Sequence, residues 1–346
     1  MQLYTLDPLS ESRWSDLAAT HPKASAFHQT GWLRALAKSY NYRVVAVTST
    51  PPGEPLSNGL VFCEVRSWIT GNRLVSLPFT DHAEPLFDDS YATLEFAEWM
   101  RKEHRQRKLG YVELRPCSGA VDPRYPLLPS QSFWLHTLDL TPSTERLFRN
   151  LHKSCIQRRI RHAERQQFSY EKGRSPELLE EFYRLLLMSR RRFRLLPQPR
   201  AWFQNLIDCM KPNVEIRLLR KDGAAVAAIL TLRHKKTVVY KYGCSDEGYH
   251  HLAGMPLLFW RLIEESKAEG AEKIDFGRTD LDNLGLIRFK GHFGADCQSL
   301  KYFRYAEKAR ERTPSLTDLP AARALFSALP GALSSRTGQL VYRHIG

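Results

Sequence analysis

The sequence predicts two tandem domains of the α/β (α+β) class, each with a mixed, mostly antiparallel sheet flanked by helices. Three observations support this fold class. The 346 residues are long for one domain and fit two domains of ordinary size. Hydrophobic residues make up 42% and charged residues 25% of the chain, a balance typical of a folded protein with a core. The same order of elements (helices, a hairpin, a further strand, a helix, closing strands) occurs twice.

In the first half, apolar residues recur at helical spacing in the segment 30–39, where Trp32, Leu33 and Leu36 share a face. The proline-rich turn 51–55 separates two runs rich in β-branched residues and predicts a hairpin. The expected helices are 11–20, 30–39 and 91–108, and the expected strands are 42–48, 60–65, 73–77, 111–115 and 134–138.

In the second half, Ser175 before Pro176 is typical of a helix start, and Gly270 is typical of a helix end. Lys221-Asp222-Gly223 lies between two apolar runs and predicts a tight hairpin. The expected helices are 144–167, 176–193, 200–210 and 256–269, and the expected strands are 215–220, 224–233, 237–243, 273–276 and 299–305.

These elements divide the chain into three parts. We expect a first domain over residues 1–143, a second over 144–306, and a tail over 307–346 that is rich in Pro, Ser and Ala and has two weak helical patches. The similarity of the two halves lies in the order of elements, because no repeat is visible in the residues themselves.

Charge is the main departure from an average composition. Lys and Arg number 51 against 37 Asp and Glu, which gives a net charge of +14. Such a balance favours nucleic acid, anionic lipid surfaces or phosphorylated ligands as partners. The segment from Glu145 to Arg200 holds 15 Lys and Arg against 6 Asp and Glu. Its cations either bind an anion, with Arg158, Arg161 and Arg165 on one helical face, or form a solvated surface.

Six cysteines lie far apart with no C-x-x-C pair, which suits a reducing compartment and predicts neither a disulfide scaffold nor a zinc framework. No other metal-binding motif is found, so we expect no metal. The N-terminus has neither a basic nor an apolar region of a signal peptide, and no apolar run approaches the roughly 20 residues of a membrane helix. We therefore expect a cytoplasmic protein, with contact to the inner membrane surface left open.

The most informative stretch is Ile274-Asp275-Phe276-Gly277-Arg278, followed by Arg288-Phe289-Lys290 and a Gly-x-x-Gly turn. We expect a short strand that stops at Gly277, with cations held at its end. Such cations suit an anionic ligand. A second motif is Asp81-His82 after a strand; this aspartate is either a general base or a turn-forming residue.

The chain from about Phe27 to Arg304 resembles the FemAB-like branch of the N-acetyltransferase (GNAT) superfamily. The matching pieces are 27–32, 77–81, 151–164, 190–192 with 196–199, and 275–278 with 285–290. The resemblance implies two tandem GNAT-like domains. The best-known members of the family transfer amino acids from aminoacyl-tRNA to a peptidoglycan precursor, and others are exopolysaccharide-associated acyltransferases.

In GNAT proteins a glycine-rich loop at the start of a helix holds the coenzyme A pyrophosphate. Here the corresponding stretch is His251-Leu252-Ala253-Gly254-Met255-Pro256, in which Gly254 is the expected cofactor-binding residue. The final proline donates no N–H group, so the stretch is either a weakened coenzyme A loop or an ordinary strand–turn–helix connection. We expect no tightly bound cofactor, and acyl-CoA or aminoacyl-tRNA as a co-substrate.

The resulting hypothesis is an acyl- or aminoacyltransferase that acts on an amine of a cell-envelope precursor, either polysaccharide or peptidoglycan. The expected catalytic residues are Lys290, with Asp275 or Asp81 as base, although Asp275 alternatively only anchors the Arg278 loop. The expected substrate-binding residues are Arg278, Arg288, Lys153, Arg158, Arg192 and Tyr242. The expected partner is an anionic precursor, nucleotide-linked or lipid-linked, with tRNA left open. The alternative hypothesis is a non-catalytic RNA-binding or interaction protein on a GNAT-like scaffold.

Overall fold

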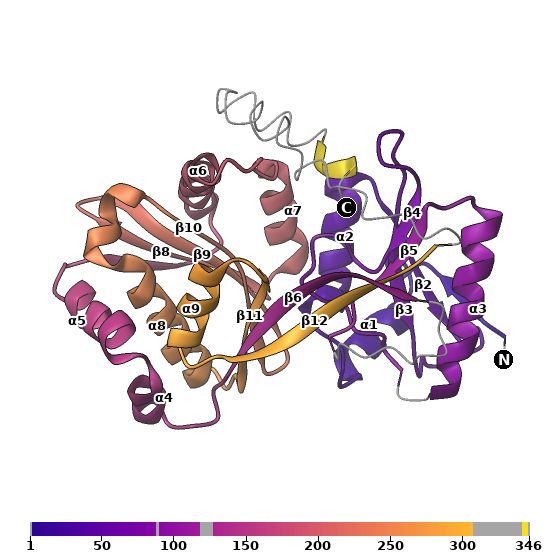
Figure 1. The fold of residues 1–346 in the computed structure, drawn as a ribbon, viewed down its shortest axis with the longest axis horizontal. Coiled ribbons are helices and arrows are strands. Elements are labelled where there is room, and N and C mark those ends of the chain that lie inside the picture. The colour runs from indigo at the N-terminus through magenta and orange to yellow at the C-terminus, as the bar shows by residue number, and fades with distance from the viewer. Residues whose placement is uncertain (1, 88–89, 118–126, 307–340, 345–346) are drawn as a thin grey trace. The chain divides into compact units, whose positions relative to one another are not determined.

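The computed structural model describes residues 2–87, 90–117, 127–306 and 341–344. It divides the chain into two compact units (Figure 1). Among the described residues, unit 1 contains 2–133, 299–306 and 341–344, and unit 2 contains Trp134–Gln298. The mixed α/β class predicted from the sequence is confirmed. Among the described residues, no helix is both long enough and apolar enough to span a membrane.

Unit 1 is a sheet in the order β1-β2-β3-β4-β5-β12. Its pairs are antiparallel except β4–β5, which is parallel and is connected through a helix. The strands are β1 (Tyr4–Leu6), β2 (Arg43–Thr48), β3 (Leu60–Val65), β4 (Arg73–Val75), β5 (Tyr111–Leu114) and β12 (Asp296–Tyr305). The helices are α1 (Ser12–Thr20), η1 (Ala26–His28), α2 (Thr30–Tyr40) and α3 (Ser90–Gln106). Phe96, Ala97 and Met100 of α3 pack against the strands.

Unit 2 repeats this plan in the order β6-β11-β10-β9-β8-β7. Here too the pairs β7–β8, β8–β9 and β9–β10 are antiparallel and β10–β11 is parallel. The strands are β6 (Leu128–Asp139), β7 (Ser169–Gly173), β8 (Val214–Lys221), β9 (Ala224–His234), β10 (Thr237–Ser245) and β11 (Lys273–Asp280). The helices are α4 (Thr144–Asn150), η2 (Lys153–Gln157), α5 (Arg158–Glu164), α6 (Pro176–Arg192), α7 (Arg200–Met210), η3 (Glu247–Leu252), α8 (Gly254–Ala268) and α9 (Leu284–His292).

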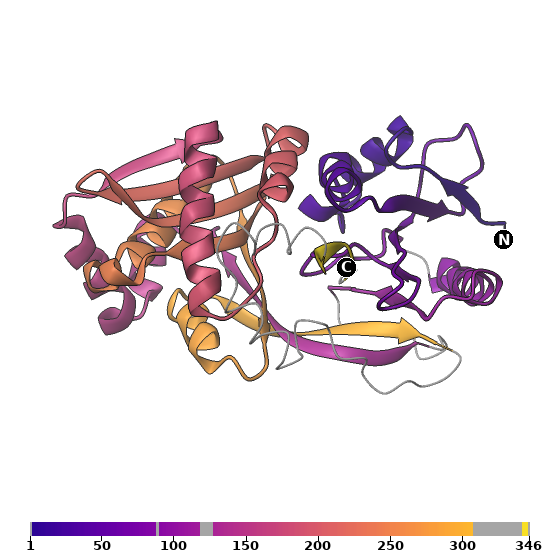
Figure 2. The ribbon, with the colours of Figure 1, turned by 90° about the horizontal axis from the view of Figure 1, so that it is seen from above.

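Helices cover both faces of the unit 2 sheet. Helices α6 and α7 pack on one face against β8, β9 and β10, and α8 packs on the other face with α5 beside it (Figures 1 and 2). The apolar core between α8 and the sheet includes Leu219, Ile229, Leu258, Ile263 and Ile274. The hairpin predicted at Lys221-Asp222-Gly223 is confirmed; Asp222 and Gly223 have φ of 51° and 80°, the left-handed values that a tight turn requires.

Four sequence expectations differ from the structure. The helix expected over 144–167 is broken after Asn150, where Leu151 and His152 leave helical geometry and η2 begins as a π-helix. The strand expected to stop at Gly277 continues to Asp280. Helix α9, which contains Arg288, Phe289 and Lys290, was not expected. Strands β1 and β7 were not expected. The tail patches expected within 307–340 lie outside the described residues.

The two units exchange their last strands. Strand β6 follows β5 in the sequence but lies beside β11, whereas β12 follows β11 and lies beside β5. The chain therefore passes from one unit to the other within β6 and again within β12. The expected domain boundaries, 1–143 and 144–306, differ from the compact units in the assignment of these two strands and stay a proposal.

A buried ion cluster joins β12 to β5 in unit 1. Glu113 of β5 is 1% exposed and forms ion pairs with Arg115 at 2.8 Å and with Arg304 of β12 at 2.6 Å. Burial disfavours the carboxylate, but the two guanidinium groups outweigh burial and hold the pKa of Glu113 below its ordinary value of 4.5. The cluster therefore stabilises the attachment of β12 while Glu113 is ionised.

We predict that Glu113→Gln destabilises the protein by about 3 kcal/mol at neutral pH, because two arginines lose a buried partner. The folded-state pKa of Glu113 lies below the unfolded-state value, so its contribution is present above that unfolded value. It is lost as the pH falls through the folded-state pKa. The difference between wild type and variant, measured by urea unfolding, should thus shrink in strong acid. Glu98→Gln, which breaks an exposed pair with Arg101, is the control and should change stability little.

Candidate active site

The central feature of unit 2 is the short pairing of its two parallel strands. Strands β10 and β11 pair only over Thr237–Val239 and Lys273–Asp275, although β10 continues to Ser245 and β11 to Asp280. A register shift between Tyr240 and Tyr242 marks a β-bulge in β10 directly beyond the last pair. Main-chain polar groups on the separated strand ends need other partners, so the open end of this pair is suited to binding an extended ligand.

Lys290 of α9 forms hydrogen bonds with residues near the C-terminal end of β11. This residue is 4% exposed, and its ammonium group donates to the main-chain oxygens of Gly277 at 2.9 Å and Arg278 at 3.1 Å, and to Thr279 Oγ1 at 2.8 Å. Asp275 is also buried, and its Oδ1 accepts from the Gly277 N–H at 2.7 Å. The two predicted catalytic residues therefore meet at Gly277, whose φ of 72° suits glycine. Both side chains hold the backbone of this turn in shape.

Aromatic packing fixes the helices that carry these residues. Phe259 of α8 contacts Tyr240 of β10 with ring centroids 4.8 Å apart, Phe276 of β11 at 5.7 Å, and Phe289 and Phe293 at 5.3 and 5.4 Å. One buried ring thus connects both separated strands to the segment that contains Lys290. The position of Lys290 relative to β11 follows from this packing as well as from its hydrogen bonds.

Tyr240 is a candidate catalytic residue that the sequence did not reveal. Its hydroxyl lies over Gly243, so close that a Cβ atom there would be 2.1 Å from the oxygen. No hydrogen bond to this hydroxyl is found among the described residues. Burial, with a smaller effect of Cys244, raises the pKa of Tyr240 far above its ordinary value, so the hydroxyl keeps its proton and can donate a hydrogen bond. The sequence shows only the pair Tyr240-x-Tyr242. The bulge lies between these two tyrosines, which have different hydroxyl environments, and it has no simple sequence signal.

A buried histidine lies next to Lys290 and was also not found from the sequence. His136 of β6 is 1% exposed, and its Nδ1 lies 3.5 Å from Thr279 Oγ1, the hydroxyl that accepts from Lys290. Burial and the positive charge of Lys290 lower the pKa of His136 to about 4, so the ring is neutral near pH 7. Its Nε2 is buried without a hydrogen-bond partner among the described residues. The contacts from Lys290 through Thr279 to His136 thus involve only one of the two imidazole nitrogens.

The expected cofactor-binding residue Gly254 is the first residue of α8. Ala253 before it has φ of 61°, no side chain caps the helix, and the first turn contains no acidic residue. The N–H groups of Gly254 and Met255 thus lie at a helix start that attracts anions, whereas Pro256 has no N–H group to contribute. This arrangement is compatible with a reduced pyrophosphate loop.

The predicted substrate-binding cations differ in exposure. Lys153, Arg158 and Arg288 are exposed, whereas Arg192 is half-buried and lies over the Phe193 ring, 4.7 Å from its centroid. Arg278 is half-buried on β11. These residues all belong to unit 2, and the exposed ones are accessible to a phosphorylated ligand.

Two further predicted residues lie in packed surroundings. Tyr242 is 8% exposed, and its hydroxyl accepts from Trp202 Nε1 of α7 at 2.9 Å. Asp81 belongs to unit 1 and is 9% exposed. Its main-chain oxygen accepts from the Tyr302 hydroxyl at 2.6 Å. Asp81 is therefore in a different unit from Asp275 and Lys290.

Comparison with known proteins identifies the fold family of unit 2. Residues 149–290 match the model of the acetyltransferase (GNAT) domain. No curated protein matches the chain by sequence. The predictions of a GNAT-type domain and of an acyltransferase are confirmed by this match.

Solved structures extend the similarity of fold to most of the chain. FemX matches with a TM-score of 0.69 at 12% identity, over 88% of this chain and 97% of that one. The C-terminal domain of a putative lysylphosphatidylglycerol synthetase from Agrobacterium fabrum matches with a TM-score of 0.56 at 13% identity, over 94% and 95%. A tandem GNAT protein from the clavulanic acid biosynthesis pathway matches with a TM-score of 0.55 at 13% identity, over 89% and 100%. The predicted fold of two tandem GNAT-like domains is thus supported.

We predict that Lys290→Met lowers the free energy of unfolding by about 3 kcal/mol, because buried acceptors at Gly277, Arg278 and Thr279 lose a charged donor. Urea unfolding followed by circular dichroism measures this change. The exposed Lys153→Met is the matched control and should unfold as wild type does. A stable Lys290→Met protein would show that these bonds contribute little to the fold.

We predict that Gly243→Ala displaces the Tyr240 ring, because the added methyl group and the hydroxyl oxygen cannot both occupy their positions. The ring is rigid and packs on Phe259, so the strain cannot be relieved by the end of a flexible chain. A crystal structure of the variant should show a shifted Tyr240 side chain. Gly110→Ala, where an added Cβ would meet only an ordinary contact of 3.6 Å with the Asn72 main-chain oxygen, serves as the comparison and should leave Tyr240 in place.

Proposed function

We propose that the chain transfers an acyl or aminoacyl group to an amine of an anionic cell-envelope precursor. The observation that carries this proposal is the open end of the β10–β11 pair in a GNAT acyltransferase domain. The same unit contains a helix start without a side-chain cap, exposed cations, and a tyrosine hydroxyl for which no hydrogen bond is found among the described residues. The named relatives of similar fold, FemX and a lysylphosphatidylglycerol synthetase, support an envelope substrate.

In the proposed reaction the acceptor amine attacks the carbonyl carbon of an activated ester or thioester. The enzyme holds both reactants in line, supports the negative charge on the carbonyl oxygen, and returns a proton to the leaving group. Tyr240 relays this proton: its hydroxyl donates to the leaving oxygen or sulfur while it takes up the proton that the attacking amine loses, so it is protonated before and after transfer. No hydrogen-bond partner of this hydroxyl is found among the described residues. Lys290 acts by shaping the Gly277–Thr279 backbone and by placing positive charge nearby. Asp275 fits the anchoring role better than the role of base, since its Oδ1 already accepts from Gly277.

Acyl-CoA is the co-substrate of GNAT enzymes, and we propose that the start of α8 at Gly254 receives its pyrophosphate. The missing N–H of Pro256 predicts weak binding of the donor rather than a retained cofactor. Aminoacyl-tRNA is the second donor to test, because Arg158 and Arg165 are exposed cations without a side-chain partner among the described residues. For the same reason, RNA binding without catalysis stays the alternative function.

We further propose a cytoplasmic site of action at the inner face of the membrane. Trp68, 89% exposed, and Ile69, 43% exposed, follow β3 and lie beside the exposed Arg66. Apolar side chains beside a cation suit the surface of an anionic bilayer. The acceptor is then a lipid-linked peptidoglycan or exopolysaccharide precursor rather than a free nucleotide-sugar.

We predict that Tyr240→Phe lowers the turnover number about 100-fold with little change in KM, the size expected for loss of a general acid. Transfer is followed by mass spectrometry with acyl-CoA or aminoacyl-tRNA as donor and envelope precursors as acceptors. Tyr305→Phe in unit 1 removes another buried hydroxyl and should keep full activity. Equal loss in both variants would remove Tyr240 from the mechanism.

The same assay decides between the two functions. Transfer from neither donor, combined with RNA affinity that falls steeply with salt at a slope of about −0.7 per neutralised phosphate, would favour the RNA-binding alternative. Transfer from one donor would identify that donor class.

A further inference from the structure

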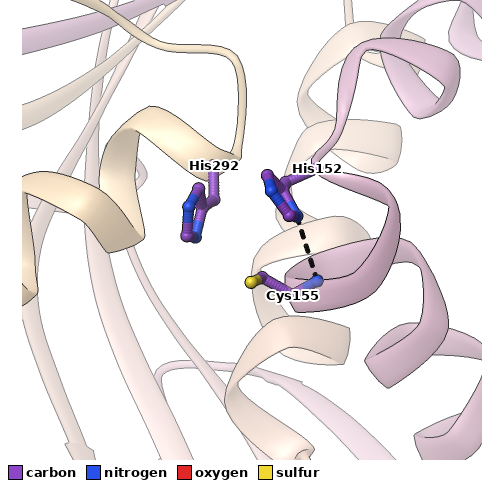
Figure 3. A group of neighbouring side chains, drawn as sticks. All are labelled: His152, Cys155 and His292. Atoms are coloured by element: carbon purple, nitrogen blue, oxygen red, sulfur yellow. Dashed lines mark hydrogen bonds between the residues drawn. The ribbon is translucent and has the colours of Figure 1, made fainter.

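Three metal-ligating side chains meet in unit 2. They are His152, at the break after α4, Cys155 in η2, and His292 at the end of α9. One potential ligand atom from each residue lies within 4.8 Å of the other two (Figure 3). Figure 3 shows the two imidazole rings next to each other, with the cysteine sulfur on the same side of η2 as the rings. None of the three has a role in the proposed acyl transfer.

The main chain holds this cluster together. The His152 N–H donates to the main-chain oxygen of His292 at 2.8 Å, which ties the start of η2 to the end of α9. The Cys155 N–H donates to His152 Nδ1 at 3.2 Å, so the imidazole caps η2 (Figure 3). The ring centroids of His152 and His292 are 4.4 Å apart. Main-chain hydrogen bonds and the contact between the two imidazole rings therefore bring the three side chains together.

The ligand atoms have little competition from the protein. Among the described residues, neither ring nitrogen of His292 has a hydrogen-bond partner, and Cys155 Sγ has only a distant contact of 3.9 Å with Ser154 Oγ. Because His152 Nδ1 accepts from an N–H group, it carries the lone pair of the neutral ring. Binding a cation through Nδ1 exchanges that bond for a metal bond, and the Cys155 N–H at the exposed start of η2 can then face water.

We propose that His152, Cys155 and His292 bind a zinc ion, with water at a fourth, open position. Two imidazole nitrogens and one thiolate are a donor set that zinc prefers, whereas magnesium and calcium prefer oxygen ligands. Donors on a tetrahedral zinc ion lie roughly 3.3–3.8 Å apart, so the side chains need to approach by about 1 Å. His152 is exposed and the other two residues are half-buried, which leaves room for this movement.

The zinc site adds a second tie to α9, the helix that contains Lys290. An ion held by His152, Cys155 and His292 would fix the end of α9 to the start of η2, two residues beyond Lys290. The site therefore steadies the backbone around Lys290 without touching a reactant. It also replaces the sequence expectation that the chain has no metal, since the His-x-x-Cys pair is completed only by a residue distant in the sequence.

The test uses the full chain, stripped of metal with a chelator and titrated with Zn²⁺ or Co²⁺. We expect one zinc ion per chain and, with cobalt, a thiolate-to-metal charge-transfer band in the near ultraviolet. Cys155→Ser should abolish this band, and both Cys155→Ser and His292→Ala should weaken zinc binding at least about 100-fold. His292→Cys supplies another zinc ligand at the same position and should keep tight binding.

Cys297→Ser is the matched control, because Cys297 is an exposed free cysteine outside the cluster. It should bind zinc as wild type does, and zinc should raise the melting temperature of both but not of Cys155→Ser. Circular dichroism checks that each variant is folded. The proposal is overturned if the stripped wild type binds no zinc, or if Cys155→Ser and His292→Ala bind it with unchanged affinity.

Discussion

The rest of unit 2 depends on one constraint, the restriction of β10–β11 pairing to three residue pairs. Longer pairing would satisfy the main chain internally and leave no place for a ligand between the strands. Because the pairing is short, side-chain contacts around the two strands hold them in place instead. Phe259 packs against residues of both strands, and Lys290 binds the end of β11. The features that shape the proposed site are therefore the ones that compensate for the missing strand pairs.

The exchange of β6 and β12 is a second constraint, because it makes each unit depend on the other half of the chain. Each unit needs a strand from the other half of the chain to complete its sheet, so neither half is expected to be stable alone. In unit 1 this strand is attached through a charged contact, since Arg304 of β12 pairs with the buried Glu113 of β5. Without β12, Glu113 would lose its ion pair with Arg304 and keep the one with Arg115, so the cluster favours the exchanged arrangement over one in which β12 is absent.

Local patterns predicted much of this structure, and long-range contacts account for what they missed. The hairpin at Asp222-Gly223 and the repeated order of elements followed from turn residues and periodicity. The helix expected over 144–167 failed at Leu151 and His152, because the contact of His152 with His292 is invisible to a helical pattern. Lys290 was predicted from the sequence as a catalytic cation, and this role stays a prediction. Its burial depends on α9, a helix that was not expected from the sequence. His136 became a candidate only once the sheet placed it beside Thr279, and Tyr240 only once the bulge in β10 was known.

The cations of unit 2 consequently fall into two groups with different physical roles. Lys290 has exchanged water for three protein acceptors and so acts as a fixed charge that shapes the backbone and lowers the pKa of His136. Lys153, Arg158 and Arg288 are exposed, so contact with phosphate oxygens would change the stability of the fold little. A fixed buried charge suits the reacting carbonyl, where reorganisation is costly, whereas hydrated surface charges suit the capture of a flexible anionic acceptor. This division argues for a site in which recognition and chemistry use separate cations.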